Sequence, residues 1–203
     1  MLDGAVRQRL EPILDRTGRR LAKLGVTANA VTVVSCFVGL GAAALIANGW
    51  LMVGLLVMVL SRIGDGLDGA VARASRGTDF GGFLDIVLDF VFYGAIPFAF
   101  ILHDPGANAI AGAALIFAFY INGASFLAYA VVAEKRRLST RARGVKSIYF
   151  TTGLAEATET LAVFILACLW PAGFPIVAWV FAAVCLYTAV SRIMLARATF
   201  AAG

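Results

Sequence analysis

The chain has 203 residues, of which 61% are hydrophobic and 14% are charged, and its formal net charge is +5. Because soluble domains are only roughly 45–50% apolar, this composition excludes an ordinary soluble domain and predicts a helical membrane protein. The three cysteines, Cys36, Cys168 and Cys185, all lie in apolar stretches, a pattern that indicates packing rather than a disulfide framework or a metal site.

Residues 1–26 predict a juxtamembrane amphipathic helix. One face carries Val6, Leu10, Ile13, Leu14, Thr17, Leu21 and Leu24 at helical spacing, and the other carries Arg7, Arg9, Arg16, Arg19, Arg20 and Lys23. A basic face of this kind suits anionic lipid headgroups. A basic flank that only sets the topology of the first span explains the same charges.

Residues 27–203 predict one membrane domain of six transmembrane helices. Residues 24–61 carry no formal charge and are interrupted by Asn48-Gly49, which predicts two spans of ~20 residues joined by a tight turn. Four further spans are expected at residues 81–102, 108–133, 148–170 and 176–196. The predicted fold class is therefore all-α: an integral membrane six-helix bundle that follows the juxtamembrane helix.

The basic residues predict the orientation of this bundle. All 17 Lys and Arg residues lie before the first span, around the second and fourth connections, or at the end of the sixth span, and the opposite turns carry none. Because cytoplasmic loops carry the excess of Lys and Arg, both termini and residues 65–89 are expected at the cytoplasmic face. No nucleic-acid partner is expected. Small residues such as Gly39, Gly41 and Ala43 suit a homodimer interface or internal packing equally well.

Four aspartates gather at the boundary of the second and third predicted spans. Asp65 and Asp68 are three residues apart, and Asp85 and Asp89 are four apart, so each pair shares a helix face and the pairs can face each other. Charges at bilayer depth are costly and usually functional. Carboxylates without His or Cys suit Mg²⁺ or Mn²⁺, and a cluster of this size can support two-metal phosphoryl transfer.

Two other interpretations of the aspartates are open. Arg62, Arg73 and Arg76 lie close to them in sequence, so an internal ion-pair cluster is one alternative. A divalent-cation transporter is another, although no comparable acids continue toward the opposite face.

The segment from Asp65 to Asp89 reads D-x2-D-G-x2-A-R-x7-G-x3-D-x3-D, which resembles the signature of the CDP-alcohol phosphatidyltransferase family. The resemblance implies transfer of a phosphatidyl group from CDP-diacylglycerol to the hydroxyl of a small alcohol or alcohol phosphate, with release of CMP, in phospholipid biosynthesis. The stretches 81–85 and 153–160 are similar to a little-characterised bacterial branch of the family, which implies a multi-pass protein of the bacterial cytoplasmic (inner) membrane.

The same resemblance implies roles for individual residues. One metal ion would be held by Asp65, Asp68 and Asp85, and a second by Asp65, Asp85 and Asp89. Asp89 would also be the general base. The residues implied to bind the CDP-linked donor are Asn29, Thr32, Gly69, Arg73 and Thr78.

The alcohol acceptor is left open by the sequence. The candidate acceptor-binding residues belong to the last three spans. The cations Lys135, Lys146 and Arg192 lie near the cytoplasmic ends, and Glu156 and Glu159 lie deeper in the fifth span. The cations suit an anionic acceptor, with glycerol 3-phosphate as first choice and inositol phosphate as an alternative, although membrane topology also explains them. The glutamates either pair with these cations or favour serine, choline or another polyol.

Overall fold

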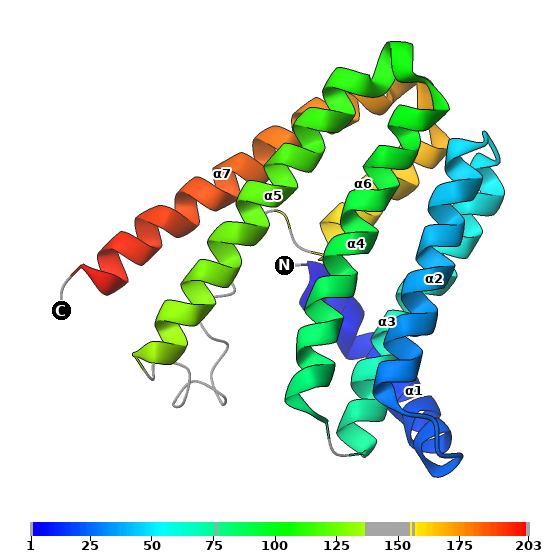
Figure 1. Cartoon of the computed structure of the whole chain (residues 1–203), viewed down its shortest axis with the longest axis vertical. Coiled ribbons are helices and arrows are strands. Elements are labelled where there is room, and N and C mark those ends of the chain that lie inside the picture. Colours follow the sequence, from blue (N-terminus) through cyan, green and yellow to red (C-terminus); the bar gives the residue numbers. More distant parts are fainter. Residues whose placement is uncertain (1, 76, 137–154, 156, 202–203) are drawn as a thin grey trace.

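The structure is a computed structural model that describes residues 2–75, 77–136, 155 and 157–201. These residues are all-helical, as predicted (Figure 1). The elements in chain order are α1 (Leu2–Lys23), α2 (Ala28–Ala47), α3 (Leu51–Ala74), α4 (Asp79–His103), α5 (Pro105–Lys135), α6 (Ala157–Leu169), the short 3₁₀ helix η3 (Pro171–Gly173) and α7 (Phe174–Phe200).

Four stretches of the described chain are long and apolar enough to cross a membrane: α2, α4, α5 and η3 together with α7. Helix α3 has 24 residues, which is long enough to cross a membrane. Its second half carries the charged residues Arg62, Asp65, Asp68 and Arg73, so α3 is not among the four apolar stretches. Helix α6 has 13 residues, and residues 148–154 of the predicted fifth span lie outside the described residues. The structure thus supports four spans, and the count of six stays a prediction.

Local sequence explains the turns at the end of the bundle that carries no Lys or Arg. Gly49 has φ +83°, a conformation that residues with a Cβ rarely adopt, and it allows the short turn between α2 and α3. Asp104 ends α4 and caps α5, because its side chain accepts a hydrogen bond from the Ala107 amide at 3.1 Å and Pro105 begins the next helix.

The helices form two groups that meet through an aromatic core. Helix α2 packs against α3 and α4, and α5 runs beside α7 (Figure 1). Phe100 of α4 stacks on Phe174 of α7 with ring centroids 4.6 Å apart, and Phe92 of α4 meets Phe164 of α6 edge to face at 6.3 Å. These four rings are almost fully buried. Each such pair contributes about 0.5–1.5 kcal/mol beyond its buried area.

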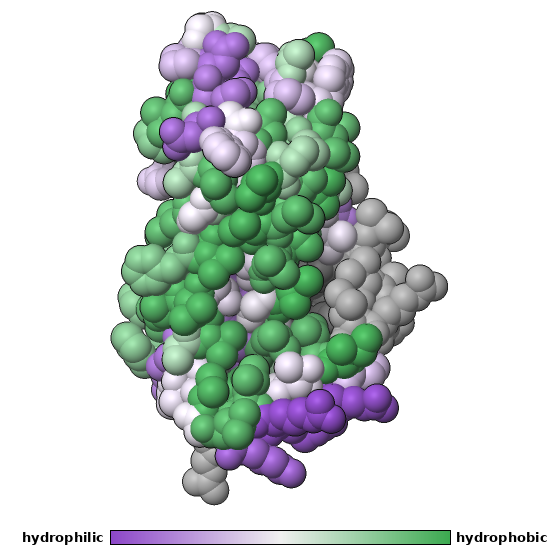
Figure 2. Space-filling view, turned by 90° about the vertical axis from the view of Figure 1, so that its right-hand side faces the viewer, coloured by the Kyte–Doolittle hydropathy of each residue, from purple (hydrophilic) through white to green (hydrophobic). Residues whose placement is uncertain are grey.

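The outer surface is strongly apolar. Figure 2 shows a wide hydrophobic band across the middle of one face, with hydrophilic residues gathered at both ends. Exposed large side chains include Phe37 of α2, Phe98 of α4, Phe117 of α5 and Ile193 of α7. Soluble monomers rarely expose apolar surface on this scale, so the band fits contact with lipid.

The segment predicted to be an amphipathic juxtamembrane helix forms helix α1, which lies against the last turns of α3. A glycine makes this approach close: a Cβ added to Gly18 would lie 2.7 Å from Ala70 and 2.9 Å from the Val71 amide nitrogen. Arg73 of α3 donates a hydrogen bond to Asp15 of α1 at 2.7 Å. Four basic side chains of the described part of α1 gather around one concavity: Arg16, Arg19, Arg20 and Lys23.

Candidate metal centre

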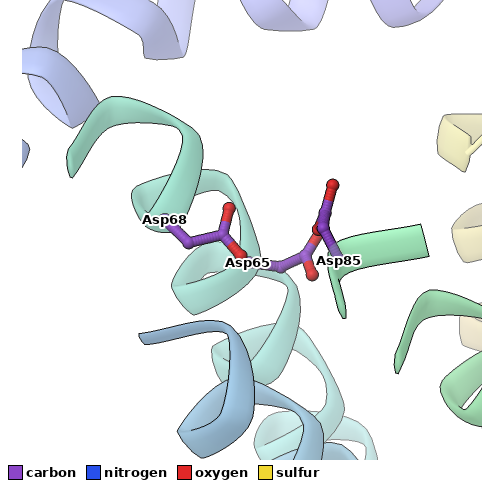
Figure 3. Close-up of side chains that lie close together, drawn as sticks. All are labelled: Asp65, Asp68 and Asp85. Atoms are coloured by element: carbon purple, nitrogen blue, oxygen red, sulfur yellow. The ribbon is translucent and has the colours of Figure 1, made fainter. Parts of the chain in front are cut away.

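Three of the four predicted aspartates lie together where α3 and α4 face each other. Asp65 and Asp68 come from α3 and Asp85 from α4 (Figure 3). One carboxylate oxygen from each residue lies within 4.8 Å of the other two. The helical spacing read from the sequence therefore does bring carboxylates from two helices to one place.

Close packing between α2 and α3 fixes where along the α2 axis the α3 aspartates lie. A Cβ added to Gly64, next to Asp65, would overlap the Ser35 side chain of α2. The Ser61 hydroxyl donates a hydrogen bond to the Ser35 carbonyl at 2.7 Å, and both serines are buried. The absence of a side chain at Gly64 thus lets α2 lie directly beside the turn that carries Asp65.

The start of α4 fixes the position of Asp85. Thr78 is the N-cap, and its hydroxyl accepts a hydrogen bond from the Gly81 amide at 3.0 Å. A Cβ added to Gly81 would lie 2.7 Å from Asn29 Oδ1 of α2. Two residues predicted to bind the donor, Asn29 and Thr78, therefore meet around Gly81, one helical turn before Asp85.

Thr32, also predicted to bind the donor, contacts an aspartate. Its hydroxyl donates a hydrogen bond to Asp68 Oδ2 at 2.7 Å, and both side chains are buried, with Asp68 only 7% exposed. A buried carboxylate needs such partners. The contact fixes the orientation of Asp68 within the group of three.

Asp89 lies outside that group and is bound by Arg62. The sequence suggests Arg62 as a partner of the aspartates only in the alternative in which they form an internal ion-pair cluster. Arg62 Nη1 donates a hydrogen bond to Asp89 Oδ1 at 2.9 Å and lies 3.4 Å from Asp65 Oδ2. Arg62 precedes Asp65 by three residues, so the two share a helix face. This spacing is the signal that could have identified Arg62 as part of the site.

Gly69 and Arg73, the other two residues predicted to bind the CDP-linked donor, lie near the end of α3. A Cβ added to Gly69 would lie 3.5 Å from Arg73 Nη1, so the guanidinium extends beside Gly69. Its Nη2 binds Asp15 of α1. No spacing in the sequence relates positions 15 and 73, and sequence reasoning missed Asp15 for that reason.

Three of the five candidate acceptor-binding residues lie within the described part of the chain. Arg192 of α7 is held by α5, because its Nη1 lies 2.9 Å from both the carbonyl oxygen and Oδ1 of Asn122 and 2.6 Å from Ser125 Oγ. Lys135 is exposed in the last turn of α5, and Glu159 lies in the first turn of α6. Lys146 and Glu156 lie outside the described residues.

The three grouped aspartates fit a divalent ion. Two oxygens on opposite sides of one Mg²⁺ lie ~4.2 Å apart, given metal–oxygen distances of ~2.1 Å, and the group spans 4.8 Å, so small side-chain rotations suffice. The donors are all carboxylate oxygens, the ligand type that Mg²⁺ and Mn²⁺ prefer. A divalent ion held by these carboxylates would neutralise the anionic oxygens of a phosphate.

Sequence comparisons agree with this chemistry. A family model described as CDP-alcohol phosphatidyltransferase matches residues 25–191. Inner membrane protein YnjF of Escherichia coli is 46% identical over 193 residues, which cover 95% of this chain and 94% of that protein. An archaetidylinositol phosphate synthase of Pyrococcus horikoshii is 35% identical over 86 residues, which cover 41% of this chain and 45% of that protein.

Solved structures share the fold. Mycobacterium tuberculosis phosphatidylinositol phosphate synthase with CDP-DAG bound aligns with a TM-score of 0.71 and 23% identity, over 90% of this chain and 92% of that one. The same enzyme in complex with manganese and citrate aligns with a TM-score of 0.65 and 23% identity, over 89% and 87% of the two chains. At this identity the likeness is one of fold.

Proposed function

The chain belongs to the CDP-alcohol phosphatidyltransferase family, and we propose that it transfers a phosphatidyl group from CDP-diacylglycerol to the hydroxyl of a small alcohol, in phospholipid biosynthesis. The observation that carries this proposal is the group formed by Asp65, Asp68 and Asp85 on two facing helices. These are three of the four aspartates at the fixed positions of the family signature.

In the proposed reaction, the acceptor oxygen forms a bond to the lipid-side phosphorus of the donor diphosphate. The bond from that phosphorus to the bridging oxygen breaks, and CMP leaves with the bridging oxygen. Asp89 accepts the proton of the attacking hydroxyl. Asn29 and Thr78, at the start of α4, and Gly69 and Arg73, at the end of α3, bind the CDP part of the donor.

The proposed cofactor is Mg²⁺ or Mn²⁺, held by Asp65, Asp68 and Asp85. When bound there, the ion offsets negative charge on the diphosphate and on the departing CMP. Support comes from the all-carboxylate ligand set and from the fold shared with an enzyme solved with manganese. The second ion implied by the resemblance would need Asp89, which Arg62 binds in this structure.

We further propose that the acceptor is a phosphorylated polyol, with glycerol 3-phosphate and inositol phosphate as the two to compare. Support comes from the Pyrococcus horikoshii relative named as an archaetidylinositol phosphate synthase, which matches part of this chain, and from the cations Lys135 and Arg192. A guanidinium has five N–H donors, so Arg192 can bind α5 through Nη1 and still bind a phosphate. Lys146, Glu156 and Glu159 complete the proposed acceptor pocket.

For the arrangement in the membrane, we propose that residues 27–203 form six spans and that residues 1–26 lie at the interface, in the bacterial inner membrane. Both termini and the aspartates lie on the cytoplasmic side in this proposal. Support comes from the one-sided distribution of the 17 basic residues and from the identity to an inner membrane protein. The basic side chains Arg16, Arg19, Arg20 and Lys23 on α1 would face anionic headgroups.

The experiment that tests the function supplies the purified chain with labelled CDP-diacylglycerol, Mn²⁺ or Mg²⁺, and a panel of acceptors, and measures release of CMP. We expect release with a phosphorylated polyol and none after the metal is removed with a chelator. The panel contains glycerol 3-phosphate, inositol phosphate, serine, choline and free inositol. Failure of every acceptor, together with Mn²⁺ flux into liposomes that contain the protein, would instead support a cation transporter.

A further inference from the structure

Arg62 lies inside the aspartate cluster rather than at its edge. Its side chain is 11% exposed, and its Nη1 atom contacts Asp89 at 2.9 Å and Asp65 at 3.4 Å. Asp65 is therefore shared between the group of three aspartates and the arginine. A cation that belongs to the chain thus contacts two of the carboxylates that the family resemblance assigns to a second metal ion.

The surrounding core holds this guanidinium in place. Its Cζ lies 3.7 Å from the centroid of the Phe92 ring, and Nη2 donates a hydrogen bond to Ser61 Oγ at 3.3 Å. Phe92 and Ser61 are 0% and 1% exposed, so the cation–π contact is desolvated and strong. Behind them, a Cβ on Gly39 would lie 2.7 Å from Phe92 and 2.9 Å from Ser61 Oγ. The guanidinium therefore has no space to move toward α2.

A second divalent ion and this arginine compete for the same carboxylates. An ion bound by Asp89 and Asp65 would lie next to the guanidinium, and two positive charges at such a separation repel strongly in a partly buried site. An arginine does not relieve that repulsion by losing its proton. The second ion would therefore require Arg62 to break its pairs with both carboxylates and leave its ring contact.

We propose that Arg62 takes the place of the second metal ion, so that the cluster binds one divalent ion on Asp65, Asp68 and Asp85 while the guanidinium holds Asp89 beside it. This inference rests on the proposed metal site and deepens it. Arg62 is then a positioning residue, because it fixes the carboxylate that accepts the proton of the acceptor hydroxyl. The chain itself then supplies one of the two positive charges that a second divalent ion would bring.

The test counts bound metal ions. The full chain is purified in detergent, treated with chelator and equilibrated by dialysis with Mn²⁺, and bound Mn²⁺ per chain is measured. We expect one ion in the wild type and in Arg62→Lys, which keeps the charge. We expect two in Arg62→Met, which fills a similar volume without charge and frees Asp89. Arg197→Met, the same change at an exposed position of α7, is the matched control and should bind one.

Asp89→Asn gives an independent measurement that does not depend on the folding of the Arg62 variants. If Asp89 is not a metal ligand, this variant binds one ion, like the wild type. Two ions in the wild type that fall to one in Asp89→Asn would overturn the inference, and so would one ion in a folded Arg62→Met. Absence of bound Mn²⁺ from the wild type would overturn it together with the proposed metal site.

Release of CMP separates this inference from the proposed function. One ion per chain without CMP release from any acceptor supports the one-ion cluster, in which Arg62 takes the place of the second ion, and refutes the transferase proposal. CMP release by a wild type that binds two ions supports the transferase and refutes the role of Arg62.

Discussion

The hydroxyl of Thr32 in α2 donates a 2.7 Å hydrogen bond to Asp68 in α3, 36 positions further along the chain. The contact ties the first apolar helix to the metal centre and orients a carboxylate that is itself almost fully buried. Partners of this kind hold a ligand in the geometry that the metal requires, and their loss typically costs 10–100-fold in metal affinity or activity.

We therefore expect Thr32→Val to raise the Mn²⁺ concentration at half-maximal rate by about 10-fold or more. Valine keeps the shape of threonine but removes the hydroxyl that donates to Asp68. Thr32→Ser keeps the hydroxyl and should stay close to the wild type. The rate of CMP release measured against Mn²⁺ concentration gives the answer. Equal curves for Val and Ser would show that the hydrogen bond does not matter for metal binding.

The general base gives a second prediction. Asp89→Asn removes the proton acceptor but keeps the size of the side chain, so kcat should fall by about 10²-fold or more. Asp104→Asn is the matched control, because Asp104 caps α5 at the end of the bundle opposite the four aspartates and asparagine caps a helix as well as aspartate does. Turnover of Asp89→Asn equal to that of Asp104→Asn would remove Asp89 from the chemistry.

Gly18 gives a third prediction, on the contact between α1 and α3. A Cβ at this position meets backbone and side-chain atoms of α3 at 2.7 Å, so Gly18→Ala should push the helices apart at a cost of about 1–3 kcal/mol. The apparent melting temperature in detergent should fall. Gly41→Ala is the control, since a Cβ there meets nothing within 4 Å, and it should melt at or above the wild-type temperature. A Gly18→Ala variant as stable as Gly41→Ala would mean that α1 does not pack against α3 this closely.

Arg192 gives a fourth prediction, which separates its contacts with α5 from acceptor binding. Arg192→Lys keeps a charge but loses the planar guanidinium, and we expect KM for a phosphorylated acceptor to rise about 10-fold or more, because a hydrogen bond to a charged group contributes about 1.5–3 kcal/mol. KM for CDP-diacylglycerol should not change. A fall in melting temperature with both KM values unchanged would leave Arg192 only its contacts with Asn122 and Ser125 of α5.

The orientation of the bundle gives a fifth prediction. A reporter that is active only outside the cytoplasm should be active when fused after Asn48 or His103 and inactive when fused after Lys146 or at the C-terminus. The physical reason is that basic loops stay in the cytoplasm. Activity of the fusion after Lys146 would contradict the six-span arrangement.

Helix positions were largely predictable from the sequence because the apolar runs are bounded by strong local signals. The third predicted span, 81–102, corresponds to α4, Asp79–His103, whose two ends are fixed by Thr78 and Asp104. Helix α3 was harder to delimit. It continues to Ala74, well past the apolar run that ends at Ser61, because its polar half is stabilised by contacts with α1 and α2 that hydropathy does not record.

The candidate site was predictable as far as helical periodicity reaches. Spacing alone placed Asp65 and Asp68 on one face of a helix and predicted that they would meet Asp85. The contact between Arg62 and Asp89 depends on the rotation and relative height of α3 and α4, which the close approach of Gly64 to α2 helps to set. No one-dimensional pattern contains those quantities, and the same holds for the ion pair between Asp15 and Arg73.

The arginine among the carboxylates also has a consequence for handling the protein. Aspartates without any counter-charge would push α3 and α4 apart once a chelator had removed the metal, and Arg62 offsets part of that repulsion. The chain should therefore stay folded and monodisperse in detergent without metal. Preparations can then start from a metal-free sample, and Mg²⁺ and Mn²⁺ can be compared by adding each ion in counted amounts.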